Sequence, residues 1–208
     1  MNDKELVSAL RKEINAERSK LLGNSSGGGD FHVTFWKAAK EHISGVADLE
    51  EKVEYLISKD PKHRRRLYPE LCNGFLMWWD ESRRQRNEPL TISPKVVKAV
   101  RSFSDLNAVV RVENVLAIDI WDETSKVIYP YFSEMPVLSA EAARLGIWLL
   151  SETLSEYPSD CFRILDVLRG RSFDVRDVPL KGDEEELFLT KYEIVLRKWR
   201  DLREEYDF

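Results

Sequence analysis

The stretch that decides the fold class is VRVENVLAIDI, residues 110–120. Its even-numbered positions are apolar except for Asn114, while Arg111, Glu113 and Asp119 occupy odd-numbered ones. An alternation with a period of two predicts a half-buried strand or two short strands. Residues 122–125 (DETS) predict a turn, after which residues 127–131 return as a partner strand. Pro130 cannot donate to a strand ladder, so this strand lies at an edge or ends there.

Helical spacing dominates the chain on both sides of these strands. Apolar residues at three- and four-residue steps predict helices over 3–22, throughout 31–90, from Ser93 to about 103 and from Ser139 to about 156. Residues 161–169 fit a short helix or a strand equally well. The clearest helix spans 184–206 and carries an aromatic-rich stripe. The stripe consists of Phe188, Tyr192, Val195, Trp199, Leu202 and Tyr206.

These elements predict an α+β fold that is predominantly helical. Helices pack around a small antiparallel hairpin or sheet at about 108–132, and a long amphipathic helix closes the chain. We expect an N-terminal helix over 1–22, a Gly/Ser-rich linker over 23–30 and one globular domain over 31–208. Within that domain, 31–103 is the helical part and 104–208 holds the hairpin and further helices.

Composition restricts the class of protein. The chain has 208 residues with 43% hydrophobic and 33% charged side chains, which suits a folded domain. Its net charge of −5 does not suggest nucleic acid as an obligate partner. Two widely spaced cysteines predict reduced thiols rather than a disulfide framework. The charged first ten residues predict no signal peptide, and no apolar run suits a membrane span. We therefore expect a cytoplasmic protein that does not contact a membrane.

The glycine-rich run at 23–30 invites comparison with a phosphate-binding loop. That loop needs Lys and then Ser or Thr after its last glycine, because these residues contact the phosphates and Mg²⁺. Here Gly29 and Asp30 stand at those positions, and the run follows a helix. The composition therefore predicts a linker.

Histidines and cysteines offer no recognised catalytic or metal-binding pattern. His32, His42 and His63 lack the spacing that presents two metal ligands from one element. Neither Cys72 nor Cys161 lies in a nucleophile motif. We expect no metal and no cofactor.

Acidic residues on and before the alternating strand give the best catalytic candidates. Asp105, Glu113, Asp119 and Lys126 would form the site. A strand with carboxylates near a lysine resembles the restriction-endonuclease-like nucleases, whose second motif is an acidic residue, one spacer and Lys. Such a resemblance implies carboxylates that hold Mg²⁺ for hydrolysis. Ile120 and Trp121 follow Asp119, so the Lys of the motif is absent, and Lys126 would have to act from across the turn. The alternative is that these residues line the solvated face of a strand.

Basic and aromatic residues over 59–86 give the best binding candidates. The segment contains eight basic and four acidic residues. Basic side chains can contact phosphates, and the aromatic side chains among them can stack on bases. The binding candidates are Arg64, Arg65, Arg66, Trp78, Trp79, Arg83, Arg84 and Arg86. The alternative is that the last three arginines interact with a helix dipole and that the tryptophans belong to the core. Two adjacent tryptophans cannot share one helix face, so one must lie at a helix seam or an interface.

The leading hypothesis is a non-catalytic adaptor subunit that binds another protein, or a second copy of itself, through its first or last helix. Surplus aromatic residues and the two amphipathic helices at the ends of the sequence favour it. The alternative is an accessory protein that binds nucleic acid through 59–86, including a divergent metal-dependent nuclease, for example in an antiviral defence system.

Overall fold

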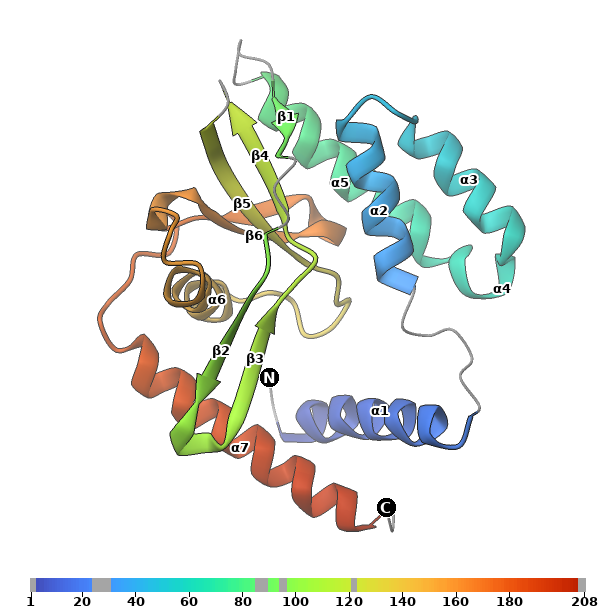
Figure 1. The fold of residues 1–208 in the computed structure, drawn as a ribbon. Helices are drawn as coiled ribbons and strands as arrows, with labels where there is room; N and C mark the ends of the chain where they lie inside the picture. Colours follow the sequence, from blue (N-terminus) through green and yellow to red (C-terminus); the bar gives the residue numbers. More distant parts are fainter. Residues whose placement is uncertain (1–2, 24–30, 85–89, 94–96, 121–122, 206–208) are drawn as a thin grey trace.

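A computed structural model describes residues 3–23, 31–84, 90–93, 97–120 and 123–205 (Figure 1). The helices are α1 (Asp3–Leu21), α2 (Phe31–Ile43), α3 (Leu49–Lys59), α4 (Pro61–Arg64), α5 (Leu67–Arg84), α6 (Ala140–Thr153) and α7 (Glu184–Glu205). The strands are β1 (Thr91–Ile92), β2 (Ala99–Phe103), β3 (Ala108–Val112), β4 (Leu116–Ile120), β5 (Glu123–Tyr131), β6 (Phe162–Asp166) and β7 (Arg171–Phe173). The 3-10 turns within the described ranges are η2 (Ser104–Leu106), η3 (Ser159–Cys161) and η4 (Val167–Arg169).

A mixed sheet in the order β1-β4-β5-β6-β7 forms the centre of the molecule. Its neighbouring strands are antiparallel except β5 and β6, which are parallel. Two parallel strands need a long crossover, and α6 lies within it. The prediction of a predominantly helical α+β fold with a long last helix is confirmed, and the sheet extends beyond residues 108–132.

Helices cover both faces of this sheet. On one face, Leu116, Ile118 and Ile128 pack with buried residues of α2, α3 and α5. On the other face, Ala117 and Val127 pack with buried residues of α6. Figure 1 shows α2, α3 and α5 on one side of the strands and α6 on the other. Burial on both faces explains why β4 is almost continuously apolar.

Local signals place several helix starts correctly. The Asp48 side chain accepts a hydrogen bond from the backbone N–H of Glu51 at the start of α3, and Ser139 caps α6 by accepting from the N–H of Ala142. The ambiguous stretch 161–169 contains strand β6 followed by η4. Pro130 lies beyond Ile128, the last β5 residue paired with β4, and the strand ends one residue after it.

The predicted helix from Ser93 to about 103 is wrong. Residues 99–103 form β2, which pairs with β3 in a separate two-stranded hairpin. Asn107 adopts a left-handed conformation (φ 46°) after η2 and so turns the chain back. Alternating burial along β2, ending at the buried Phe103, explains the strand, because one side of the hairpin packs on the body.

Helix α1 lies at the edge of the molecule, beside α7 (Figure 1). Within the described ranges, α7 is the only element against which α1 packs extensively. The same ranges contain no helix that combines the length and apolarity needed to cross a membrane.

Candidate functional site

The first half of α7 is anchored to the body. The Phe188 ring lies 5.0 Å from that of Phe103 in the hairpin and 5.4 Å from that of Trp148 in α6, centroid to centroid. At the helix start, Glu184 is only 2% exposed and pairs with the buried Arg144. Burial alone would raise the pKa of Glu184. The backbone N–H groups of Lys181 and Gly182, together with Arg144, outweigh that effect and hold this pKa below its usual value.

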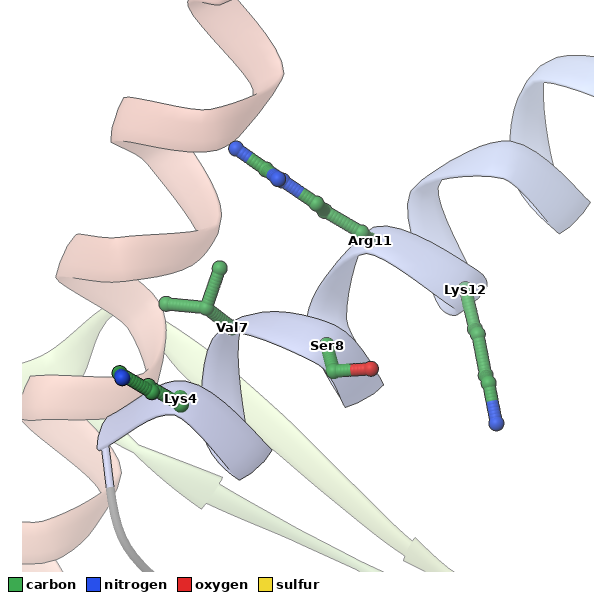
Figure 2. Close-up of a pocket in the computed structure, with 5 residues that line it drawn as sticks. All are labelled: Lys4, Val7, Ser8, Arg11 and Lys12. Atoms are coloured by element: carbon green, nitrogen blue, oxygen red, sulfur yellow. The ribbon is translucent and has the colours of Figure 1, made fainter.

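The second half of α7 is covered by α1. Leu6, Leu10 and Ile14 of α1 form a small buried cluster with Leu202 of α7, and Trp199 packs at its edge. Two exposed ion pairs flank the cluster, at 3.4 Å between Arg11 and Glu205 and at 3.6 Å between Glu17 and Arg203. Figure 2 shows Val7 and Arg11 directed toward α7 and Lys12 directed away from it. At the seam between the two helices, the amphipathic α1 therefore covers part of the apolar stripe on α7.

A groove of about 640 Å³ runs along the other side of α1. Lys4, Ser8 and Lys12 line its α1 wall, and Met135, 69% exposed, lies on the opposite wall. His32 also lines this groove, and its burial lowers the pKa of the imidazole. An exposed apolar side chain, Met135, thus lies beside α1, in addition to the buried apolar residues that α1 covers.

The basic binding candidates lie at opposite ends of α5. Arg64 packs over the Tyr68 ring and donates to the Leu56 carbonyl, and Arg66 donates from Nη1 and Nη2 to the two carboxylate oxygens of Glu134. Arg65 is exposed beside them. Arg83 and Arg84 are exposed in the last turn of α5, about 25 Å away at about 1.5 Å rise per residue. Arg86 lies outside the described residues. The structure does not bring the described arginines together on one patch.

Trp78 and Trp79 are both buried in the core between the sheet and the helices. Their ring centroids are 6.1 Å apart. One of the two tryptophans was expected to lie off the main stripe, either at a helix seam or at an interface. It lies at a seam, because α5 packs against α3 on one side and against η4 on the other. Neither ring is available for stacking on a base.

The acidic candidates are also separated. Asp105 is exposed at the tip of the β2–β3 hairpin, and Glu113 is exposed directly after β3. Asp119 is buried on β4, and its neighbour Ile118 pairs with Lys126 of β5. Because strand side chains alternate, Asp119 and Lys126 project from opposite faces of the sheet. No three His, Cys, Asp or Glu side chains in the described ranges are grouped to hold a metal ion.

The other candidate ligands and nucleophiles have structural surroundings. His42 accepts a hydrogen bond from the Leu49 N–H, and His63 contacts Asp60. Burial, with Glu50 and Asp48 nearby, raises the pKa of the Cys72 thiol to about 11. Burial also raises the pKa of Cys161. Both cysteines are free, so both are protonated thiols at neutral pH. Residues 24–30, which hold most of the glycine-rich run, lie outside the described residues.

A polar pocket that sequence reasoning missed lies where the end of α5 covers β5, β6 and β7. It measures about 440 Å³, and its lining includes Lys126, Arg163, Ser172 and Arg171. The available signal was Arg163 itself, a charged residue within the buried strand sequence FRILD. Comparison with known proteins adds no assignment, because no family model, curated protein or solved structure matches the chain.

Proposed function

We propose that this protein is a non-catalytic interaction subunit that binds a partner protein through the stripe on α7 that α1 covers. The partner would contribute an amphipathic helix. The observation that carries the proposal is the α1–α7 seam, where a helix of the chain's own already occupies the stripe. Helix-in-groove recognition uses apolar anchors at steps of three or four residues along one helix face, and Leu6, Leu10 and Ile14 follow one another at steps of four.

The attachment of α1 supports exchange of one helix for another. Among the α1 side chains that the structure describes, three are buried in the seam, whereas five are buried on the shorter α2. Isolated helices of this length are marginal in water, so α1 depends on this small contact for its helical state. A partner helix with a longer apolar face would therefore compete effectively with α1.

Nucleic-acid binding through residues 59–86 has less support. The arginines lie at the two ends of α5, and Arg66 is paired with Glu134. Phosphate contacts along a backbone need cations on one continuous surface. A metal-dependent nuclease has less support still, since Asp105, Glu113 and Asp119 lie apart.

The test is to release α1 in the full chain. Ile14 is completely buried in the seam, so Ile14→Asp places a charge there and should detach α1. Asn15→Asp adds the same charge at the neighbouring, exposed position and is the matched control. A labelled peptide of residues 3–22 should bind the Ile14→Asp variant, measured by fluorescence anisotropy, and should bind wild type and Asn15→Asp much more weakly.

A second experiment, comparing co-purifying proteins, identifies the partner. Proteins that co-purify from the native host are compared between wild type, Ile14→Asp and Ile14→Asp combined with Trp199→Ala. The partner should be enriched by the first change and lost on adding the second. A peptide that fails to bind Ile14→Asp, or a set of co-purifying proteins that neither change alters, would refute the proposal.

A further inference from the structure

We propose that the polar pocket beside the end of α5 binds a small phosphorylated polyol, such as a sugar phosphate. Its floor comes from three adjacent strands. Lys126 of β5 pairs with Ile118, and Arg163 of β6 pairs with Ile128, so both project from the sheet face that α5 covers. Ser172 of β7 pairs with Leu165 and shares that face. Elsewhere this face is apolar, so the polar floor is a local departure.

Two glycines position the wall of the pocket, because they allow α5 to pack closely against η4 and against the turn before β7. A Cβ on Gly74 would lie 2.2 Å from the Val167 carbonyl oxygen, so only glycine permits this approach. Gly170 adopts φ 58°, and a Cβ there would meet Met77 at 2.4 Å. The turn therefore places Arg171 and Ser172 beside the last turns of α5.

Arg163 is held in position as a donor. Its Nη1 donates to the carbonyl oxygens of Asp160 and Phe162, and its Nη2 lies 3.0 Å from the Asp174 carboxylate. The side chain is only 13% exposed, and its Nε–H makes no hydrogen bond within the described ranges. A guanidinium fixed this way loses little further conformational entropy when it binds an anion.

The strongest acid in the pocket is already neutralised. The Asp174 carboxylate accepts from the Arg176 side chain and from the backbone N–H groups of Arg176 and Asp177, besides facing Arg163. Four cations and three carboxylates line the pocket, a net charge of +1 in a chain of −5. The field at the floor therefore favours an oxyanion, with Lys126 and Arg163 as its ligands. Arg171 lies one residue before Ser172 and so projects from the opposite sheet face, where its guanidinium packs over the Phe173 ring at 4.4 Å.

The other residues that line the pocket indicate the chemistry of the rest of the ligand. The volume of about 440 Å³ lies in the range of small-ligand sites and exceeds the needs of a bare phosphate. Ser82, Glu81 and Asp177 on the wall suit the hydroxyl groups of a polyol, since carboxylates accept from O–H donors. Trp78 contributes little apolar lining, so a flat aromatic base is not the expected ligand.

The test is isothermal calorimetry and thermal melting of the full chain with ribose 5-phosphate, ribose and inorganic phosphate. We expect saturable binding and a raised melting temperature with ribose 5-phosphate only, or at least about tenfold tighter binding than with either part alone. Lys126→Gln should weaken binding by about tenfold or more, because a charge-assisted hydrogen bond is lost, and Ser172→Ala should weaken it by a smaller factor, because a neutral hydrogen bond is lost.

Arg111→Gln is the matched control, because Arg111 is exposed on β3 of the separate hairpin. It should bind ribose 5-phosphate as wild type does. Denaturant melts of each variant confirm that the fold persists, with Ser172→Ala as the decisive variant if Lys126→Gln unfolds the protein. Absence of saturable binding, equal binding of inorganic phosphate, or binding unchanged by both Lys126→Gln and Ser172→Ala would overturn the proposal.

Discussion

Helices α5 and α7 have similar lengths and similar aromatic stripes, yet they occupy different environments. Eight residues of α5 are buried, and the helix packs between α3 and the sheet with its turn η4. On α7, only Glu184 and Leu202 are buried, although the helix is longer. Phe188, Tyr192 and Trp199 are half-buried. An amphipathic stripe therefore predicts that a helix packs against something, but not how completely or against what.

This difference separates a helix that builds the core from a helix that offers a surface. The α5 stripe meets the sheet, α2 and α3, all parts of one core cluster. The α7 stripe meets the body with its first half and α1 with its second half. Substitutions on α5 should therefore change stability, whereas those on the second half of α7 should change association as well.

The largest expected effect on stability comes from replacing one phenylalanine of the stripe with alanine on each helix. Phe75→Ala in α5 removes a completely buried ring and should lower the unfolding free energy by about 3–5 kcal/mol. Phe188→Ala in α7 removes a half-buried ring and should lower it by roughly half as much. Urea melts of both variants measure the two values. Equal losses would show that the first half of α7 is as much a core element as α5.

A smaller effect is expected at Gly74, where α5 touches the backbone of η4. Gly to Ala inside a helix normally stabilises by roughly 0.5–1 kcal/mol. At Gly74 the added Cβ meets backbone oxygens of Val167 and Leu168, so we expect a loss of about 1–3 kcal/mol. Asn73→Ala, exposed on the same helix, is the control and should be neutral or stabilising. A stable Gly74→Ala variant would mean that α5 and η4 are not tightly packed.

Much of the fold was predictable because local signals carried it. The caps at Asp48 and Ser139, the stripe on α7 and the period of two near 110–120 each act within a few residues. The strand at 99–103 was missed because Ser93-Pro94 signals a helix start. The pairing of β2 with β3, a contact between segments, decides the outcome. Parallel pairing of β5 with β6 likewise depends on tertiary structure.

The candidate sites were less predictable because charge patterns do not show direction. Arg64–Arg66 and Arg83–Arg84 belong to the same basic segment, 59–86, but the length of α5 separates them in space. Asp119 and Lys126 are near in the sheet but project from opposite faces. The polar pocket combines residues from α5, β5, β6 and β7, which no linear motif joins. The first and last helices were identified from sequence, whereas their mutual contact was not.

Trp199 offers a direct test of the division within α7. Trp199 is half-buried at the α1 seam, so Trp199→Ala should lower the unfolding free energy by only about 1–2 kcal/mol. It should also weaken binding of the α1 peptide to the Ile14→Asp variant by roughly tenfold. Denaturant melts and sedimentation separate the two effects. Trp79→Ala is the comparison on α5 and should cost about 3–5 kcal/mol. A Trp199→Ala variant unchanged in both stability and association would leave α7 without either role.

The smallest expected effect is a pH dependence of stability that appears only in acid and arises beside α5. Burial raises the pKa of Asp174, but Arg176, Arg163 and the Asp177 N–H outweigh burial and lower it to about 2. The unfolded chain has the ordinary value near 3.8. A carboxylate whose pKa is lower in the folded state stabilises the fold fully above the unfolded pKa. That contribution is therefore intact above about pH 4 and is lost as the pH falls toward 2.

Asp174→Asn isolates this contribution. The difference in unfolding free energy between wild type and Asp174→Asn should be constant from pH 7 to about 5 and should shrink between about pH 4 and 2, because wild type then also carries a neutral side chain. The ion pairs flanking the α1–α7 seam are exposed and contribute little, so Arg11→Gln should show no comparable trend. A constant difference for Asp174→Asn down to pH 2.5 would show that Asp174 is not held by its arginines. It would also remove the electrostatic contrast between the charged pocket beside α5 and the exposed seam on α7.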